Sequence, residues 1–328
     1  MTTSRSGRAP RVSVVVPTFD GADLVAALLR SLERQTIPHE VIVVDNGSTD
    51  RTAEVVGAAA GVRLVRLDAN VGFGRAVNRG VVEAQGDTLV LLNNDVECEP
   101  EFLERLCDAL DPSSGVTMAA GVLLKAHDPR IIDTAGIEFD PTLLAFDYLH
   151  GQERSVLDNG VRDPIGPCAG AAAFHREAFE GVGGFDENIF AYLEDVDLIV
   201  RLLARGDRCR LAPGALALHR HSATLGARSR AKNDLIGWSR GYLIGKYRLH
   251  RRPGLFARTV VEELTGALGK LAVDRAGLAL RPRLEGWRAG RSAQACELPS
   301  FPPRVHEISI LDAHRRRIRR RAHWLQTP

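Results

Sequence analysis

The sequence lacks the long apolar segments and paired cysteines that mark membrane-spanning and secreted proteins. A membrane-spanning helix needs roughly 18 to 20 uncharged residues in a row. The sequence of 328 residues contains no uncharged stretch of that length. Its 5 cysteines are odd in number and scattered, with no CxxC pair, which favours reduced thiols and a cytoplasmic protein. The apolar run 12–16 is too short for the core of a signal peptide.

A strong excess of one charge is also missing, because 43 Lys and Arg against 41 Asp and Glu leave a net charge of +2. The overall balance therefore indicates no particular partner. Hydrophobic residues make up 45% of the chain, enough for a sizeable core. Arginines crowd only near the C-terminus, at Arg315, Arg316, Arg317, Arg319, Arg320 and Arg321. No nucleic-acid recognition motif accompanies them, so we expect no nucleic-acid partner.

Short β-branched runs alternate with amphipathic segments in the first part of the chain, the pattern of an α/β fold with a mainly parallel sheet flanked by helices. We predict early strands over 12–16, 41–44, 62–67 and 88–92, with helices over 20–35, 49–60 and 73–84. Further strands are expected over 116–124, 131–139, 169–174, 208–211 and 215–219, and helices over 194–205 and 255–280. The expected organisation is a disordered leader over 1–10, one α/β domain over 11–229, and a helical C-terminal extension over 230–328 with a basic tail.

Polar clusters follow three of these strands: Pro17-Thr18-Phe19, Asp45-Asn46 and Asn93-Asn94-Asp95. Ligands of open α/β sheets bind at the carboxyl ends of the strands, so three such clusters favour a nucleotide site. Any one of them alone is also explained by turn chemistry. Asp45 can accept the N3–H of uracil or thymine, which cytosine does not offer. Thr18 and the backbone near Pro17 would frame the same base.

The glycine-rich segment 70–80 leads into a predicted helix, and its amides and Arg75 suit an anionic phosphate. A plain helix-entry turn explains the glycines equally well. Together with the strand-end clusters, this segment gives ten predicted nucleotide-binding residues: Pro17, Thr18, Phe19, Asp45, Asn46, Gly74, Arg75, Asn78, Asn93 and Asn94.

Two residues are candidate ligands for a divalent cation. Asp95 follows a buried strand, and Mg²⁺ or Mn²⁺ prefers carboxylate oxygens together with substrate phosphates. His219 follows a later strand, where a neutral imidazole can join a carboxylate around the ion. A turn aspartate and a structural histidine are the alternatives.

Glu194, Asp195 and Asp197 form an acidic cluster at the start of a predicted helix. Favourable interaction with the helix dipole explains one or two of them. A carboxylate that is partly removed from water can act as a general base. We therefore predict Asp195 as the catalytic base, with Glu194 beside it in the catalytic site.

In order and spacing, these pieces resemble the family 2 glycosyltransferases of the GT-A fold, over roughly residues 11 to 225. The matching segments are 14–19, 43–50, 70–78, 91–95, 183–186 and 194–198. The chain looks most like bacterial rhamnosyltransferases that build cell-wall or surface polysaccharide. The resemblance implies that Pro17, Thr18 and Asp45 hold the base, that Asp95 and His219 hold the metal, and that Asp195 is the base. Asn93 and Asn94 stand where the family often has acids, which implies lower metal affinity.

The implied activity is inverting transfer of a sugar, such as L-rhamnose, from a UDP- or dTDP-sugar to a glycan or lipid-linked acceptor. A sugar-nucleotide nucleotidyltransferase is one alternative, although Pro17-Thr18-Phe19-Asp20 replaces the glycine-rich, basic loop that such enzymes carry after the first strand. A non-catalytic, membrane-associated scaffold that binds sugar nucleotides is another. Basic residues over 228–248 indicate either a solvated helical face or a peripheral contact with the inner face of the cell membrane.

Overall fold

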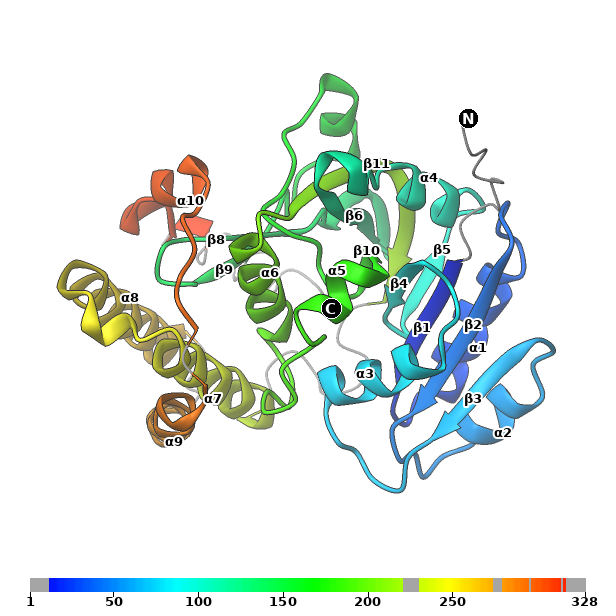
Figure 1. The fold of residues 1–328 in the computed structure, drawn as a ribbon, viewed down its shortest axis with the longest axis horizontal. Helices are drawn as coiled ribbons and strands as arrows, with labels where there is room; N and C mark the ends of the chain where they lie inside the picture. Colours follow the sequence, from blue (N-terminus) through cyan, green and yellow to red (C-terminus); the bar gives the residue numbers. More distant parts are fainter. Residues whose placement is uncertain (1–11, 221–229, 274–278, 295, 314, 317–328) are drawn as a thin grey trace, which may run out of the picture.

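The protein is described by a computed structural model that covers residues 12–220, 230–273, 279–294, 296–313 and 315–316. A curled mixed sheet has helices on both of its faces, and helices of the C-terminal part gather at one side (Figure 1). In the main sheet the strand order is β3-β2-β1-β4-β10-β6-β11-β5, with β7 paired to β6.

The first four strands form the parallel half of the sheet. They are β1 (Val12–Thr18), β2 (His39–Asp45), β3 (Val62–Arg66) and β4 (Thr88–Leu92). β1 pairs in parallel with both β2 and β4, so their carboxyl ends lie along one edge. All seven residues of β1 are buried, as expected for a strand with helices on both faces. The predicted parallel α/β core is confirmed.

The second half of the sheet is less regular. It contains β5 (Val96–Cys98), β6 (Val116–Lys125), β7 (Asp128–Thr134), β10 (Ala171–His175) and β11 (Arg208–His219). β10 runs antiparallel to both β4 and β6 and thereby joins the two halves. The separate strands predicted over 208–211 and 215–219 are one strand with an irregular register against β6. The strand predicted over 131–139 is divided at Gly136, where φ is +115°, and its second part, β8 (Ile137–Phe139), pairs with β9 (Ala145–Asp147).

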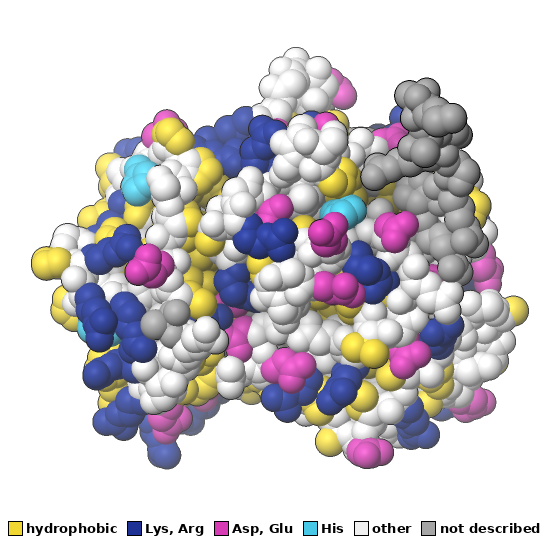
Figure 2. Space-filling view, viewed as in Figure 1, with side chains coloured by type: hydrophobic (Ala, Val, Ile, Leu, Met, Phe, Trp, Pro, Cys, Tyr) yellow, Lys and Arg dark blue, Asp and Glu magenta, His cyan; other side chains and the backbone are white. Residues whose placement is uncertain are grey.

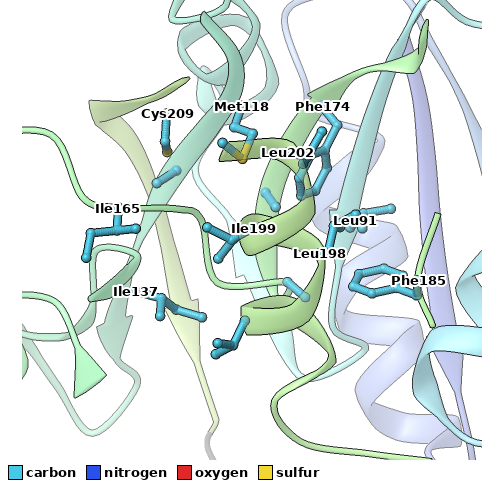
Figure 3. Packing of buried hydrophobic residues seen from close by; sticks show 14 of the residues in the cluster. Leu91, Met118, Ile137, Ile165, Phe174, Phe185, Leu198, Ile199, Leu202 and Cys209 are labelled. Carbon is cyan, nitrogen blue, oxygen red and sulfur yellow. The ribbon is translucent and has the colours of Figure 1, made fainter. Parts of the chain in front are cut away.

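Each face of the main sheet has its own apolar core. α1 (Ala22–Leu32), α2 (Thr52–Gly57) and α4 (Phe102–Asp108) pack on one face, while α3 (Phe73–Glu83), α5 (Arg176–Gly181) and α6 (Glu194–Ala204) pack on the other. In the second core, Leu198 and Leu202 of α6 lie beside Met118 and Phe174 of the sheet (Figure 3). This packing fixes α6, and with it the acids at its first turn. Short 3₁₀ helices occupy Pro112–Ser114, Arg154–Asn159 and Leu249–Arg251.

The described part of the C-terminal region is largely helical, with α7 (Arg230–Lys246), α8 (Pro253–Val273), α9 (Leu280–Ser292) and α10 (Pro303–Glu307). The helix predicted over 255–280 is therefore wrong in its bounds, because α8 ends at Val273 and α9 begins at Leu280. Glycines let α7 and α9 approach closely: a Cβ on Gly286 would lie 2.0 Å from the Trp238 carbonyl oxygen. Within the part of the chain that is described, no helix has the length and apolarity to cross a bilayer.

Candidate active site

The strand-end clusters at residues 18, 45 and 94 meet at the carboxyl edge of the parallel strands. Thr18 and Asp45 are partners in the register of β1 and β2. Asn94, just after β4, donates a hydrogen bond of 2.9 Å from Nδ2 to Thr18 Oγ1. Pro17 is buried within β1, and Phe19 is half-buried just beyond it. The predicted convergence of these clusters is thus present in the fold.

Asp45 has one satisfied and one unsatisfied carboxylate oxygen. Its side chain is fully buried, and Oδ1 accepts the Ser48 backbone N–H at 2.9 Å. Oδ2 is buried and receives no hydrogen bond from the described residues. Arg66 Nε lies 3.6 Å from Oδ2, and the Arg66 side chain is 65% exposed. A buried acceptor without a donor is costly in an apoprotein and suits a ligand N–H.

Asn46 holds the glycine-rich segment in place. Its Oδ1 accepts the Val71 backbone N–H at 2.9 Å, and its Nδ2 donates to Asn70 Oδ1 at 3.0 Å. Gly72 has φ of +92°, and a Cβ there would lie 2.4 Å from the Phe190 carbonyl oxygen. The start of α3 is therefore fixed against the loop that precedes α6.

The predicted phosphate-binding residues on α3 have protein partners in this structure. A Cβ on Gly74 would lie 2.8 Å from Phe185 Cβ, so this glycine permits close packing. Arg75 Nε lies 3.1 Å from Glu187 Oε2. Asn78 exchanges two hydrogen bonds with the Phe185 backbone, at 2.9 and 3.0 Å. Contact of Gly74, Arg75 or Asn78 with a phosphate stays a prediction.

Asp95 and His219, the two predicted metal ligands, lie side by side. Asp95 Oδ1 is 3.4 Å from His219 Nε2, and it is buried with no hydrogen-bond donor in suitable geometry among the described residues. β5, which begins directly after Asp95, pairs with the end of β11 and so brings the two residues together. A second histidine of the same segment, His221, lies outside the described residues.

Asp133 of β7 is a site residue that the sequence analysis missed. His219 Nδ1 lies 2.6 Å from Asp133 Oδ2, in a contact where both side chains are about nine-tenths buried. Burial lowers the pKa of His219, but the carboxylates of Asp133 and Asp95 raise it more, to about 10. The available signal was an acid directly after two isoleucines in a predicted strand, since Asp133 follows Ile131 and Ile132.

Asp195 and Glu194 form an acidic pair at the first turn of α6, in which Glu194 is buried and Asp195 is partly exposed. Burial raises the pKa of Asp195 to about 6, although the Val196 backbone N–H, 2.9 Å from Oδ1, opposes this shift. Burial and the charge of Asp195 raise the pKa of Glu194 to about 8. Glu194 Oε2 is buried and has no hydrogen-bond partner among the described residues. Near neutral pH the arrangement therefore favours an ionised Asp195 beside a protonated Glu194.

The segment 168–170 connects this pair to the metal-ligand candidates. The Ala169 backbone donates a hydrogen bond to Asp195, and the neighbouring Gly170 carbonyl accepts the Asn93 N–H at 3.3 Å. Burial raises the pKa of the Cys168 thiol, and the nearby charges of Asp195 and Asp133 raise it further. One short segment thus contacts both Asp195 and Asn93, and Asn93 precedes Asp95 by two positions.

Asp197, the third acid of the cluster, has a structural partner set. Its side chain is fully buried. Lys246 Nζ lies 2.6 Å from Asp197 Oδ1 and 2.7 Å from Asp186 Oδ2. Arg201 Nε donates to Asp197 Oδ2 at 2.8 Å, and Tyr247 Oη donates to Oδ1 at 2.9 Å. Asp197 therefore ties α6 to α7. This structural role accounts for the acid of the cluster that the helix dipole does not explain.

An open hollow of about 680 Å³, lined in part by Arg66, lies between the first turns of α1 and α2. Its lining includes Asp20, Asp23 and Asp50 but none of the predicted catalytic or metal-binding residues. The lining also carries Glu54 and two cations, Arg51 and Arg66, so its charge is mixed. Because neither Asp95 nor Asp195 lines the hollow, we do not assign the donor diphosphate to it.

Comparison with known proteins agrees with this arrangement. Residues 13–182 match the model of glycosyl transferase family 2. The chain is 32% identical over 244 residues to the N-acetylglucosaminyl-diphospho-decaprenol L-rhamnosyltransferase of Mycobacterium tuberculosis. The aligned region covers 65% of this chain and 77% of that protein. It is also 32% identical over 218 residues to the succinoglycan biosynthesis protein ExoO of Rhizobium meliloti, covering 63% and 60% of the two chains. 

Among solved structures, the mannosyltransferase PcManGT of Pyrobaculum calidifontis, in complex with GDP-Man and Mn²⁺, has a TM-score of 0.53 at 20% identity. The match covers 88% of this chain and 77% of that chain and shows a shared fold. With the family match and the shared fold, the chain belongs to glycosyl transferase family 2 and is a glycosyltransferase of the GT-A fold.

Proposed function

We propose that the protein transfers a sugar, with inversion, from a UDP- or dTDP-sugar to a hydroxyl of a glycan or lipid-linked glycan. The supporting observation is the series of contacts that joins Asp45, Asp95 and Asp195 through Thr18, Asn94 and the segment 168–170. The acceptor would belong to cell-wall or surface polysaccharide synthesis, which takes place at the inner face of the cell membrane in this proposal. Relatives with rhamnosyltransferase and succinoglycan-biosynthesis names support this class of product.

Asp45 would recognise the donor base. Its buried Oδ2, which lacks a donor, can accept the N3–H of uracil or thymine. Arg66 is exposed enough to move aside or to contact the base as it enters. Cytosine has no N3–H to offer Asp45, and in this proposal the donor carries UDP or dTDP. Pro17, Thr18, Phe19, Asn46, Asn93 and Asn94 would form the surrounding wall.

Asp95 and His219 would hold Mg²⁺ or Mn²⁺. The buried oxygen of Asp95 and the adjacent His219 suit a cation site, provided that Nε2 gives up its proton when the cation binds, while the Asp133 contact holds the ring by its other nitrogen. No three acidic, His or Cys side chains among the described residues are arranged to hold a metal by themselves. Donor phosphates and water would therefore complete the coordination. When bound, the cation would neutralise charge on the departing diphosphate.

Asp195 would take the proton of the acceptor hydroxyl as this oxygen attacks the anomeric carbon opposite the diphosphate. A carboxylate with a pKa raised to about 6 is ionised at neutral pH yet more basic than an exposed one. Glu194, protonated beside it, would keep a second negative charge away from the pair. Arg75 would exchange its contact with Glu187 for the diphosphate. A single displacement inverts the anomeric configuration.

A donor screen tests the proposal. Purified protein is incubated with UDP- and dTDP-sugars, dTDP-L-rhamnose among them, with Mn²⁺ or Mg²⁺ and a lipid-linked glycan acceptor. We expect release of nucleoside diphosphate and a product of inverted configuration by NMR. Asp45→Ala should weaken donor binding, while Asp108→Asn, on the exposed side of α4, should leave it unchanged. Release of pyrophosphate would instead indicate a nucleotidyltransferase, and tight donor binding without turnover would indicate a scaffold.

A further inference from the structure

α8 exposes a stripe of large apolar side chains. Phe256, Val260, Val261 and Leu264 are 44%, 39%, 43% and 60% exposed. The spacing 256, 260, 264 places three of them on one side of the helix. The opposite side is buried, with Thr259 and Glu262 only 3% and 1% exposed. None of the four belongs to an apolar core cluster of the described residues.

α9 has two exposed leucines of its own. Leu280 and Leu284 are 61% and 45% exposed. Glu263 of α8 lies 2.8 Å from Arg283 Nε of α9 and 2.9 Å from Arg240 Nε of α7, so the three helices are joined at this level. We call the six exposed side chains the α8–α9 face: Phe256, Val260, Val261, Leu264, Leu280 and Leu284.

The charge around the α8–α9 face is cationic. Arg252, Arg281, Arg288 and Arg291 are exposed on the same helices or directly before them. The acids are neutralised or turned inward: Glu262 contacts Thr142 and Arg258, and Glu285 pairs with Arg281 at 2.8 Å. Lys and Arg side chains gather with apolar ones on the side of the molecule that carries α8 and α9 (Figure 2).

α7 connects the α8–α9 face to the catalytic acids. Its first half lies against the loop before α6, where Ser239 Oγ donates to the Ala191 carbonyl at 3.0 Å. Lys232 Nζ lies 5.4 Å from the ring centre of Tyr192, two positions before Glu194. On its other side α7 packs against α9 through glycines. A membrane surface bound at α8 and α9 would therefore be linked, through the packing of α7, to the loop that precedes the proposed catalytic acids.

We propose that the α8–α9 face docks on an anionic lipid surface, with its apolar side chains in the interface and its arginines among the headgroups. Apolar residues flanked by arginines are the composition that lies in a bilayer surface. A second copy of the chain fits less well, because a two-fold interface would bring this arginine-rich face against itself. The proposal deepens the proposed function by indicating how a lipid-linked acceptor is reached.

Vesicle co-sedimentation of the full chain tests the docking. The probes are phosphatidylcholine vesicles with and without phosphatidylglycerol, and the main variant is Val260→Ser/Leu264→Ser. We expect wild type to bind the anionic vesicles, and this variant to bind them at least about tenfold more weakly because two apolar contacts are lost. Arg252→Gln/Arg288→Gln should also weaken binding and reduce its dependence on salt. Val82→Ser, at an apolar position on α3 that is even more exposed, should bind as wild type does.

Three results would overturn the docking proposal. The first is no binding of wild type to anionic vesicles, and the second is equal binding by the double serine variant and Val82→Ser. The third is a double serine variant that differs from wild type only in light scattering, by being a monomer where wild type is a dimer. Thermal unfolding of each variant checks that it is folded. Donor turnover with a water-soluble acceptor separates the two proposals. Vesicle binding without turnover removes the proposed function alone, and turnover without vesicle binding removes the docking alone.

Discussion

His219 Nδ1 lies 2.6 Å from Asp133 Oδ2, on the side of the imidazole opposite Asp95. A carboxylate at Nδ1 fixes the orientation of the ring, and in the proposed metal site it would direct Nε2 toward the cation. His150 supports the same aspartate, because its Nδ1 lies 2.6 Å from the Asp133 carbonyl oxygen. Asp133 is thus a positioning residue for the proposed metal site.

Removing this support should weaken cation binding without removing a proposed ligand. We expect Asp133→Ala to lower the affinity for Mn²⁺ by about 10- to 100-fold, as loss of an outer-shell partner does, measured by calorimetry in the presence of UDP. Asp133→Asn, whose amide oxygen can still accept from Nδ1, should lose less. Equal Mn²⁺ affinity in wild type and Asp133→Ala would show that Asp133 does not position a ligand.

Lys246, the buried lysine at the end of α7, should contribute strongly to the stability of the fold. Lys246 contacts both Asp186 and Asp197, and its side chain is only 6% exposed. We expect Lys246→Met to cost about 3 to 5 kcal/mol, because two buried carboxylates lose their shared cation. Urea denaturation measures this change in the free energy of unfolding. Arg63→Met breaks a surface pair with Glu83, so it is a matched control with an expected cost below about 1 kcal/mol.

Turnover should depend on pH through Asp195. Because burial raises the pKa of this carboxyl to about 6, its basic form is lost as the pH falls through that value. We expect the rate at saturating donor to be flat near pH 7 and to fall about tenfold per unit well below pH 6. A rate that stays constant down to pH 4.5, with the protein folded by circular dichroism, would exclude Asp195 as the base.

Glycines between α7 and α9 should tolerate no side chain. A Cβ on Gly286 or Gly241 would lie 2.0 Å from a backbone oxygen of the facing helix. We expect Gly286→Val to separate the helices and lower the melting temperature by several degrees, since overpacking costs about 1 to 3 kcal/mol. Gly254→Val is the control, because space around that position is open. Equal melting temperatures of the two variants would contradict the close packing.

The parallel half of the fold was predictable because β1, β2 and β4 are short apolar runs that end in polar residues, with amphipathic helical segments between the strands. The same logic located Asp45, Asp95 and Asp195, since strand ends and helix starts are local features. The antiparallel insertion of β10 was not predictable, because pairing partners depend on contacts far apart in sequence. Asp133 and the partners of Asp197 were missed for that reason: only the folded chain brings His219 and Lys246 to them.

The account depends most directly on the role of Asp195, which is tested by single-turnover transfer in Asp195→Asn. With dTDP-L-rhamnose or the best donor of the screen, we expect the rate to fall by about three orders of magnitude or more, while donor affinity stays within about twofold of wild type. Asp108→Asn should transfer at the wild-type rate. Wild-type transfer by Asp195→Asn would contradict the proposed mechanism.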